Sequence, residues 1–183
     1  MSRGIDDDAL VEELIHVAGG PGYSREERQR RVESRLPDAR ERIAFLMRRL
    51  AQRSDWSRFN TLENIAADLR DVPDLDRVLI DVVRSGEGPG YLEDHIEILG
   101  ELAHPAAVDD IIRVFTEREH SGGPSSGLRL KCIQALGSMG GPSARDFLRG
   151  IAEGNHPPRL KWEAAVELGI EDELGFDEDE MCG

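Results

Sequence analysis

Apolar residues recur along most of the chain at three- and four-residue intervals, the spacing that places them on one face of a helix. The first such stretch covers residues 6–18, with acidic residues at its start and Gly19-Gly20 after its end, which are helix start and stop signals. Its apolar face consists of Leu10, Leu14, Ile15 and Val17. The pattern predicts a short helix over residues 6–18.

Three more helices are predicted in the following fifty residues. Ser24 and Glu27 match the S-x-x-E capping box, so a helix begins there and ends before Pro37. The helix after Pro37 has an apolar face of Ile43, Leu46, Met47 and Leu50. Asp55 suits the N-cap of the next helix, whose apolar positions are Trp56, Phe59, Leu62, Ile65, Ala66 and Leu69.

Residues Arg77–Val83 (RVLIDVV) are rich in β-branched side chains, which on propensity alone suit a strand. The proline that precedes them and the helical pattern of their neighbours favour a helix instead. No segment has a strand pattern stronger than this one, so the predicted fold class is all-α.

A repeat of more than thirty residues runs through the chain. Pro37, Pro73, Pro105 and Pro142 are separated by 36, 32 and 37 residues, which is the range of helical solenoids. We expect each proline in the first turn of a second helix, where its missing N–H group costs nothing. The preceding helix of a pair is expected to end at a Leu-Gly dipeptide, at Leu99-Gly100, Leu136-Gly137 and Leu168-Gly169.

These residues resemble HEAT repeats, in particular the short bacterial kind also found in phycobilin lyase subunits. The best match is Leu128–Ala152 followed by Leu160–Gly169, Tyr91–Phe115 matches nearly as well, and Thr61–Val83 is weaker because Arg70 replaces the glycine. The resemblance implies a right-handed α-solenoid of about four helical hairpins with an N-terminal helical cap. It predicts one solenoid domain over residues 1–183, with three parts: cap and diverged repeat at 6–58, clearer HEAT-like repeats at 59–169, and an acidic, flexible tail at 170–183.

The chain is acidic, with 23 Lys and Arg against 37 Asp and Glu and a net charge of −14. The charge is uneven, because residues 24–58 carry a net +5 while residues 1–23 carry −4 and residues 59–183 carry −15. Such a field attracts basic partners and repels nucleic acid. The arginines of residues 24–58 alternate with glutamates, which predicts a salt-bridged pair of helices. We therefore expect a basic protein partner and no nucleic acid.

In HEAT-type solenoids the second helices line the concave surface, so the resemblance places the partner-binding site there. The candidate partner-binding residues are Arg77, Asp81, Arg84, Asp109, Arg113, Asp146, Arg149 and Glu153. The alternative is ordinary solvated helix surface, with Arg77–Asp81 and Asp109–Arg113 as ion pairs of ~0.2–0.5 kcal/mol each.

Catalytic and metal-binding motifs are not found in the sequence. Cys132 lies in an apolar helical pattern and is expected to be a small core residue, and Cys182 lies in the tail, which contains seven acids in Glu171–Glu180. We expect no cofactor, no metal and no enzyme activity.

No apolar run approaches the ~20 residues that cross a bilayer, and the N-terminus is acidic. We therefore expect a soluble cytoplasmic protein, bacterial by its resemblance, that is a monomer or weak homodimer with no membrane contact.

The predicted function is non-catalytic protein binding, as an adaptor, scaffold or regulator. One alternative is an immunity or antitoxin-like protein whose acidic surface blocks a basic toxin. A second is a lyase-like chromophore-attachment subunit, which requires a deep apolar cavity with a usable acid or base. That second alternative rests on fold analogy, and fold does not determine function.

Overall fold

The computed structural model describes residues 6–19, 22–69, 71–120 and 126–176, and these residues form helices and no β-strand. The all-α prediction is confirmed for this part of the chain, including the helix over Arg77–Val83. The chain divides into two compact units, Met1–Val78 (unit 1) and Leu79–Gly183 (unit 2). The predicted single domain over residues 1–183 stays a prediction, and each unit is described by itself below.

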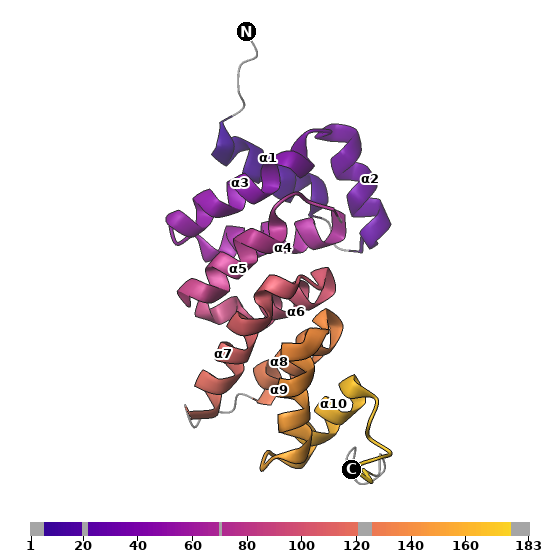
Figure 1. Cartoon of the computed structure of the whole chain (residues 1–183). Helices are drawn as coiled ribbons and strands as arrows, with labels where there is room; N and C mark the ends of the chain where they lie inside the picture. Colours follow the sequence, from indigo (N-terminus) through magenta and orange to yellow (C-terminus); the bar gives the residue numbers. More distant parts are fainter. Residues whose placement is uncertain (1–5, 20–21, 70, 121–125, 177–183) are drawn as a thin grey trace. The chain divides into compact units, whose positions relative to one another are not determined.

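Unit 1 contains four complete helices, which are α1 (Asp7–Ala18), α2 (Arg25–Arg35), α3 (Ala39–Gln52) and α4 (Trp56–Leu69), and the first residues of α5 (Leu75–Ser85) (Figure 1). Helix α4 packs against α1, α2 and α3, and so forms the centre of this unit. Its residues Phe59 and Leu62 are fully buried, as are Leu14 of α1 and Met47 of α3. The amphipathic faces expected from the sequence therefore meet in one core.

The predicted start signals of α2 and α4 are both confirmed. Ser24 and Glu27 form the complete capping box, since the Glu27 N–H group donates to Ser24 Oγ and the Ser24 N–H group donates to the Glu27 carboxylate. At α4 the Arg58 N–H group donates to the Asp55 carboxylate at 3.3 Å. Each cap satisfies a helix N–H group that has no acceptor inside the helix.

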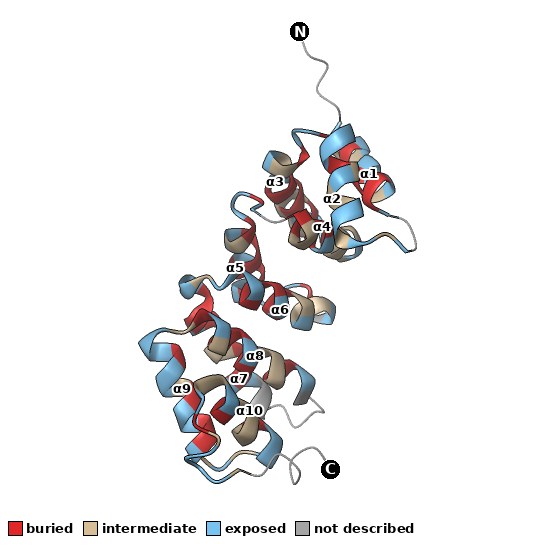
Figure 2. Ribbon diagram, turned by 90° about the vertical axis from the view of Figure 1, so that its right-hand side faces the viewer, coloured by how far each residue is buried: buried red, intermediate tan, exposed pale blue. Residues whose placement is uncertain are grey.

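Unit 2 holds the rest of α5 and five further α-helices: α6 (Leu92–Leu102), α7 (Val108–His120), α8 (Ser126–Met139), α9 (Gly141–Glu153) and α10 (Pro158–Leu168). The 3₁₀ turns η1 (Pro89–Tyr91) and η2 (Pro105–Ala107) lead into α6 and α7. Helix α8 packs between α6 and α10, while α9 contacts α7, α8 and α10. Figure 2 shows that the buried residues of each helix gather on its inward side.

Two glycines allow α6, α8 and α10 to approach closely. A Cβ atom at Gly100 of α6 would lie 2.9 Å from Ala135 Cα of α8, and one at Gly137 of α8 would lie 1.9 Å from Glu167 Oε2 of α10. Both glycines lie in the last turn of their helix, as expected, but two residues before its end and without the positive φ of a helix-ending glycine. Gly169, with φ at +67°, does end α10 as expected.

The repeated prolines occupy two kinds of position. Pro142 lies in the first turn of α9 as expected, whereas Pro105 opens the 3₁₀ turn η2, three residues before α7 begins. Pro37 and Pro73 instead lie in turns two residues before α3 and α5 begin. Pro37, Pro73 and Pro105 share one local structure. In each case the carbonyl of the residue before the proline accepts a hydrogen bond from the N–H group of the second residue after the proline.

The start of the predicted tail is folded into turns. Ile170 is buried, and the Leu174 and Phe176 N–H groups donate to the Ile170 and Glu171 carbonyls. Residues 177–183, including Cys182 and the last acids, lie outside the described residues. Within the described ranges, no helix combines the length and apolar character needed to cross a membrane.

Replacing Gly100 by alanine should destabilise unit 2 by about 1–3 kcal/mol, because the new methyl group would force α6 away from the α8 backbone. The matched control is Gly150→Ala on α9, where a Cβ meets no atom within 4 Å. That variant should be neutral or gain up to about 1 kcal/mol, since alanine is the better helix former. Urea denaturation followed by circular dichroism compares the two, and equal stabilities would contradict the proposed helix contact.

Candidate functional site

The predicted binding residues lie on three helices, α5, α7 and α9. Asp81 and Arg84 are on α5, Asp109 and Arg113 on α7, and Asp146, Arg149 and Glu153 on α9, all in unit 2. Arg77, also on α5, belongs to unit 1. Arg113 is half-buried and the other seven are exposed, so the spacing correctly predicted which side chains point off the core.

Asp110, which is not among the predicted binding residues, organises the charges on α5 and α7. Its carboxylate is largely buried and pairs with Arg84 at 2.9 Å and with Arg113 at 3.5 Å. Hydrogen bonding to Asp110 raises the pKa of the Arg84 guanidinium. The signal that identifies Asp110 is spatial, because Arg84 is 26 residues away in the sequence.

The ion pairs expected at i,i+4 spacing are wrong for both named pairs. Arg113 pairs with Asp110 and Glu117 rather than Asp109, and Arg77 pairs with Asp74 at 3.2 Å rather than with Asp81. In the part of the chain that the structure describes, Asp81 lies 3.9 Å from Arg84 instead. Sequence spacing alone does not select among several partners within reach on a helix surface.

Arg113 also joins the end of α5 to α7. Its Nη2 atom donates to the carbonyls of Val83 at 3.1 Å and Arg84 at 3.3 Å, in the last turn of α5. A cation at this end of a helix satisfies carbonyls that have no helical partner and interacts favourably with the helix dipole. The main role of Arg84 and Arg113 is therefore to hold α5 against α7.

Two carboxylates of the predicted set stay available on this surface. Asp109 of α7 and Asp146 of α9 are exposed, and among the described residues neither has an ion-pair partner. On α9, Arg149 and Glu153 pair with each other at 3.4 Å. We call Asp109, Asp146, Arg149 and Glu153 the second-helix surface.

A second surface is formed by α6, α8 and α10, which are linked by polar side chains. Lys131 pairs with Glu97 at 2.9 Å, and the Gln134 amide donates to Glu163 at 2.8 Å. Glu167 is packed over Gly137, one turn from Glu163. Burial, and secondarily the Glu163 charge, raises the pKa of Glu167.

Arg129 of α8 is a buried cation in unit 2 with aromatic and histidine neighbours. Its guanidinium carbon lies 4.3 Å from the Phe115 ring centroid, and its Nη2 atom is 3.1 Å from His156 Nδ1. Phe147 meets Phe115 edge-on, with ring centroids 5.4 Å apart. The cluster joins α7, α8 and α9 to the loop before α10, which is a structural role.

Many arginines of unit 1 form ion pairs, but mostly with acids of other helices; of the interspersed glutamates, Glu33 pairs with Arg40. Three arginines surround the C-terminal turn of α4: Arg25 and Arg28 pair with Asp68 at 3.1 and 2.5 Å, and Arg40 donates to the Leu69 carbonyl at 2.9 Å. Arg25 also donates to the Ala67 carbonyl at 3.0 Å. These cations interact favourably with the negative end of the helix dipole.

The acids of α1 are bound by arginines of α3 and α4. Asp7 pairs with Arg42 at 2.8 Å and with Arg49. Arg53, just after α3, pairs with Asp8 at 2.8 Å, and Arg58 of α4 reaches Glu12 at 3.3 Å. The net positive charge of residues 24–58 is therefore matched by carboxylates from the rest of unit 1.

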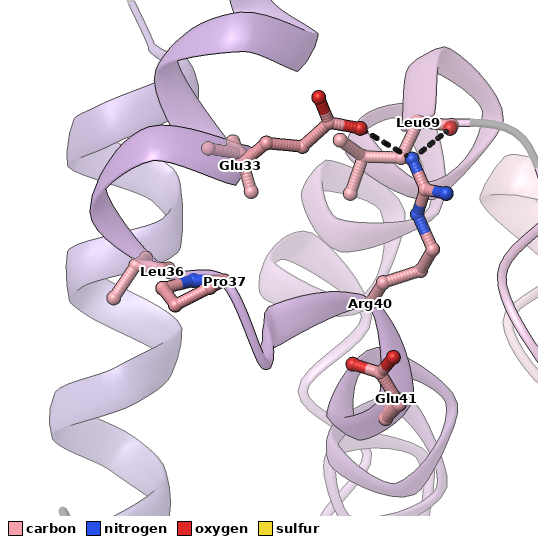
Figure 3. Close-up of a pocket in the computed structure, with 7 residues that line it drawn as sticks. Glu33, Leu36, Pro37, Arg40, Glu41 and Leu69 are labelled. Carbon is pink, nitrogen blue, oxygen red and sulfur yellow. Dashed lines mark hydrogen bonds and ion pairs between the residues drawn. The ribbon is translucent and has the colours of Figure 1, made fainter.

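Among the described residues, two surface pockets adjoin α2. The smaller, of about 160 Å³, lies between α2, α3 and the end of α4, and is lined by Val32, Glu33, Leu36, Pro37, Arg40, Glu41 and Leu69. Figure 3 shows the Arg40 guanidinium between Glu33, at 2.6 Å, and the Leu69 carbonyl. Arg40 is engaged on both sides, and the walls of this pocket combine apolar side chains with the charged side chains of Glu33, Arg40 and Glu41. The larger pocket, of about 400 Å³, is lined by Tyr23, Glu27, Arg30, Arg31 and Ser34.

Cys132 is buried in α8 as predicted. Burial raises the pKa of its thiol to about 12, with Glu93 adding to the effect and Arg129 opposing it. A thiol with this pKa is protonated at neutral pH, and the thiolate is the nucleophilic form. Cys132 is therefore a core residue. Among the described residues, no group of three or more His, Cys, Asp or Glu side chains is arranged to hold a metal ion.

Replacing Glu167 by glutamine should stabilise the protein at neutral pH. Because the folded state raises the pKa of Glu167, its ionised form disfavours folding, and this cost disappears as the pH falls through the folded pKa. We expect the melting temperature of Glu167→Gln to exceed that of the parent by about 1–3 °C at pH 7.5, and the difference to vanish near pH 4. Glu87→Gln removes the same charge from an exposed turn and should show no such trend; equal trends would contradict the assignment.

Cys132 should resist thiol reagents until unit 2 opens. In a Cys182→Ser variant, maleimide should label no thiol in the folded protein at pH 7.5 and one thiol in 6 M guanidinium chloride, because burial hinders both access and ionisation. Mass spectrometry counts the labels. Complete labelling of the folded protein within minutes would show that α8 is not packed as described.

The comparisons with known proteins leave the family open. No protein-family model, curated protein or solved structure matches this chain. The resemblance of residues 61–169 to HEAT repeats therefore rests on the residues quoted for it, and it stays a prediction.

Proposed function

We propose that unit 2 is a HEAT-like right-handed solenoid segment that binds a basic partner protein on its second-helix surface, without catalysis. The observation that carries the proposal is the repeated contact between successive first helices, α6 with α8 and α8 with α10 (Figure 1). Stacked helical pairs of this kind present extended surfaces suited to binding other proteins.

The two contacts occur at equivalent positions of the repeat. Gly100 meets Ala135, which immediately precedes Leu136-Gly137, and Gly137 meets Glu167, which immediately precedes Leu168-Gly169. The same step therefore relates α6 to α8 and α8 to α10. A repeated step between helices is the geometric property of a solenoid, and it supports that arrangement for unit 2.

The second-helix surface is suited to a basic partner by its charge and by its rigidity. Residues 79–183 carry twelve of the chain's net fourteen negative charges. Asp109 and Asp146 are exposed without ion-pair partners among the described residues, while the neighbouring Arg84–Asp110–Arg113 pairs hold α5 against α7. Carboxylates on a braced surface attract a basic partner over a distance and raise its association rate.

The proposal predicts which positions touch the partner. A photo-crosslinking amino acid is introduced at Asp109, at Asp146 or, as a control, at Ser138, which is exposed on the first helix α8. In cells of the native host, positions 109 and 146 should give crosslinks to the same basic protein, identified by mass spectrometry, and position 138 should not. Asp109→Lys combined with Asp146→Lys should weaken binding of that protein at least about tenfold.

The same experiment separates the outcomes. Crosslinks to the same protein from position 138 alone would move the site to the first helices, and an acidic partner or no crosslink at 109 and 146 would contradict the proposal. If the captured protein is an enzyme or toxin that loses its activity in the complex, this protein acts as an immunity-like inhibitor.

A further inference from the structure

Helix α2 carries three arginines that form no ion pair with a carboxylate among the described residues, Arg30, Arg31 and Arg35, and two of them line a pocket. The other two arginines of the helix, Arg25 and Arg28, both pair with Asp68. Arg30 is exposed and its Nε atom donates to the Glu26 carbonyl within α2. Arg30 and Arg31 line the pocket of about 400 Å³ described above.

The Arg31 guanidinium is held in place from two directions. Its Nε atom donates to the Val17 carbonyl at 2.9 Å, near the end of α1, and its guanidinium carbon lies 4.4 Å from the Tyr23 ring centroid. A cation–π contact and a hydrogen bond leave a long side chain little freedom. The two terminal nitrogens of Arg31 form no hydrogen bond among the described residues. They are therefore donors fixed in position and ready for a ligand.

The other pocket residues add to an anion site. Ser34 contributes a hydroxyl group, which now donates to the Arg31 carbonyl at 3.1 Å, and Tyr23 contributes an aromatic wall. Glu27 is the acid in the lining, and its Oε2 atom accepts the Ser24 N–H group in the capping box. Two guanidinium groups and one carboxylate leave the pocket net positive on a chain that is strongly acidic elsewhere.

We propose that this pocket, formed by Tyr23, Arg30, Arg31 and Ser34, binds a phosphate monoester. A phosphate dianion is matched in charge by two guanidinium groups and offers three oxygens to their planar arrays of N–H donors. A carboxylate has two oxygens and one charge, and so would use only part of this donor set. The volume lies in the range of small-ligand sites, which leaves room for an aromatic or sugar stem beside Tyr23.

The site is independent of the proposed protein-binding function, because it lies in unit 1 and uses none of the second-helix residues. The ester has two sources, a small phosphate metabolite or a phosphorylated side chain of a protein. The chemistry at the pocket is the same for both, so the test includes one probe of each kind.

The test is an NMR titration of the full chain at constant ionic strength. Phenyl phosphate should shift the amide signals of residues 23–34 selectively, with a Kd of about 0.1–10 mM, and benzoate should bind at least about fivefold more weakly. A phosphotyrosine peptide that binds ten or more times as tightly as phenyl phosphate identifies a phosphoprotein as the source, whereas equal affinity identifies a small ester. Sodium chloride at matched ionic strength gives the background.

Arg30→Gln is the decisive variant, because Arg30 makes no contact between helices and its loss should leave the fold intact. It should weaken phenyl phosphate binding at least about tenfold. Arg35→Gln removes the same charge from an exposed position on α2 outside the pocket lining, and should bind as the parent does. Equal losses in both variants, or shifts spread over the whole acidic chain, would overturn the proposal, as would the absence of phosphate-dependent shifts.

Discussion

The described helices of this protein remove their apolar side chains from water by packing against neighbouring helices. Helix α4 is covered by α1, α2 and α3, and α8 is covered on two sides by α6 and α10. Helices α6, α8 and α10 can pack this closely because glycines lie where they cross. At Gly100 and Gly137 a Cβ atom would collide with the neighbouring helix.

Charged residues then determine how helix ends are held. Arg113 covers the last carbonyls of α5 while pairing with Asp110, and Arg25 and Arg40 cover the last carbonyls of α4. An arginine can do this because its planar group donates to a carbonyl and a carboxylate at once. Individual exposed ion pairs contribute little to stability, so their effect is chiefly on which helices meet and at which turn.

Surfaces whose charges are paired with one another differ from surfaces that can still bind a charged ligand. Where arginines and acids satisfy one another, as around Asp68 and Asp110, the surface has little left to offer a ligand. Where an arginine is held in place but forms no ion pair with a carboxylate, as at Arg31, binding an anion costs little ordering of the protein. The proposed partner surface of unit 2 and the proposed phosphate pocket of unit 1 are both identified in this way, by opposite charges.

Local interactions were predictable from the sequence, and contacts between distant residues were not. The helices, the capping box at Ser24, the Asp55 cap and the outward direction of Asp109 and Asp146 follow from spacing within one or two turns, where few alternatives compete. The partners of Arg84 and Arg113, the burial of Asp110 and the true role of Gly100 depend on which helix lies alongside, and so only tertiary packing decided them. The reason is physical: a side chain's local geometry is set by its own turn of helix, whereas its environment is set by residues that the chain brings back from far away.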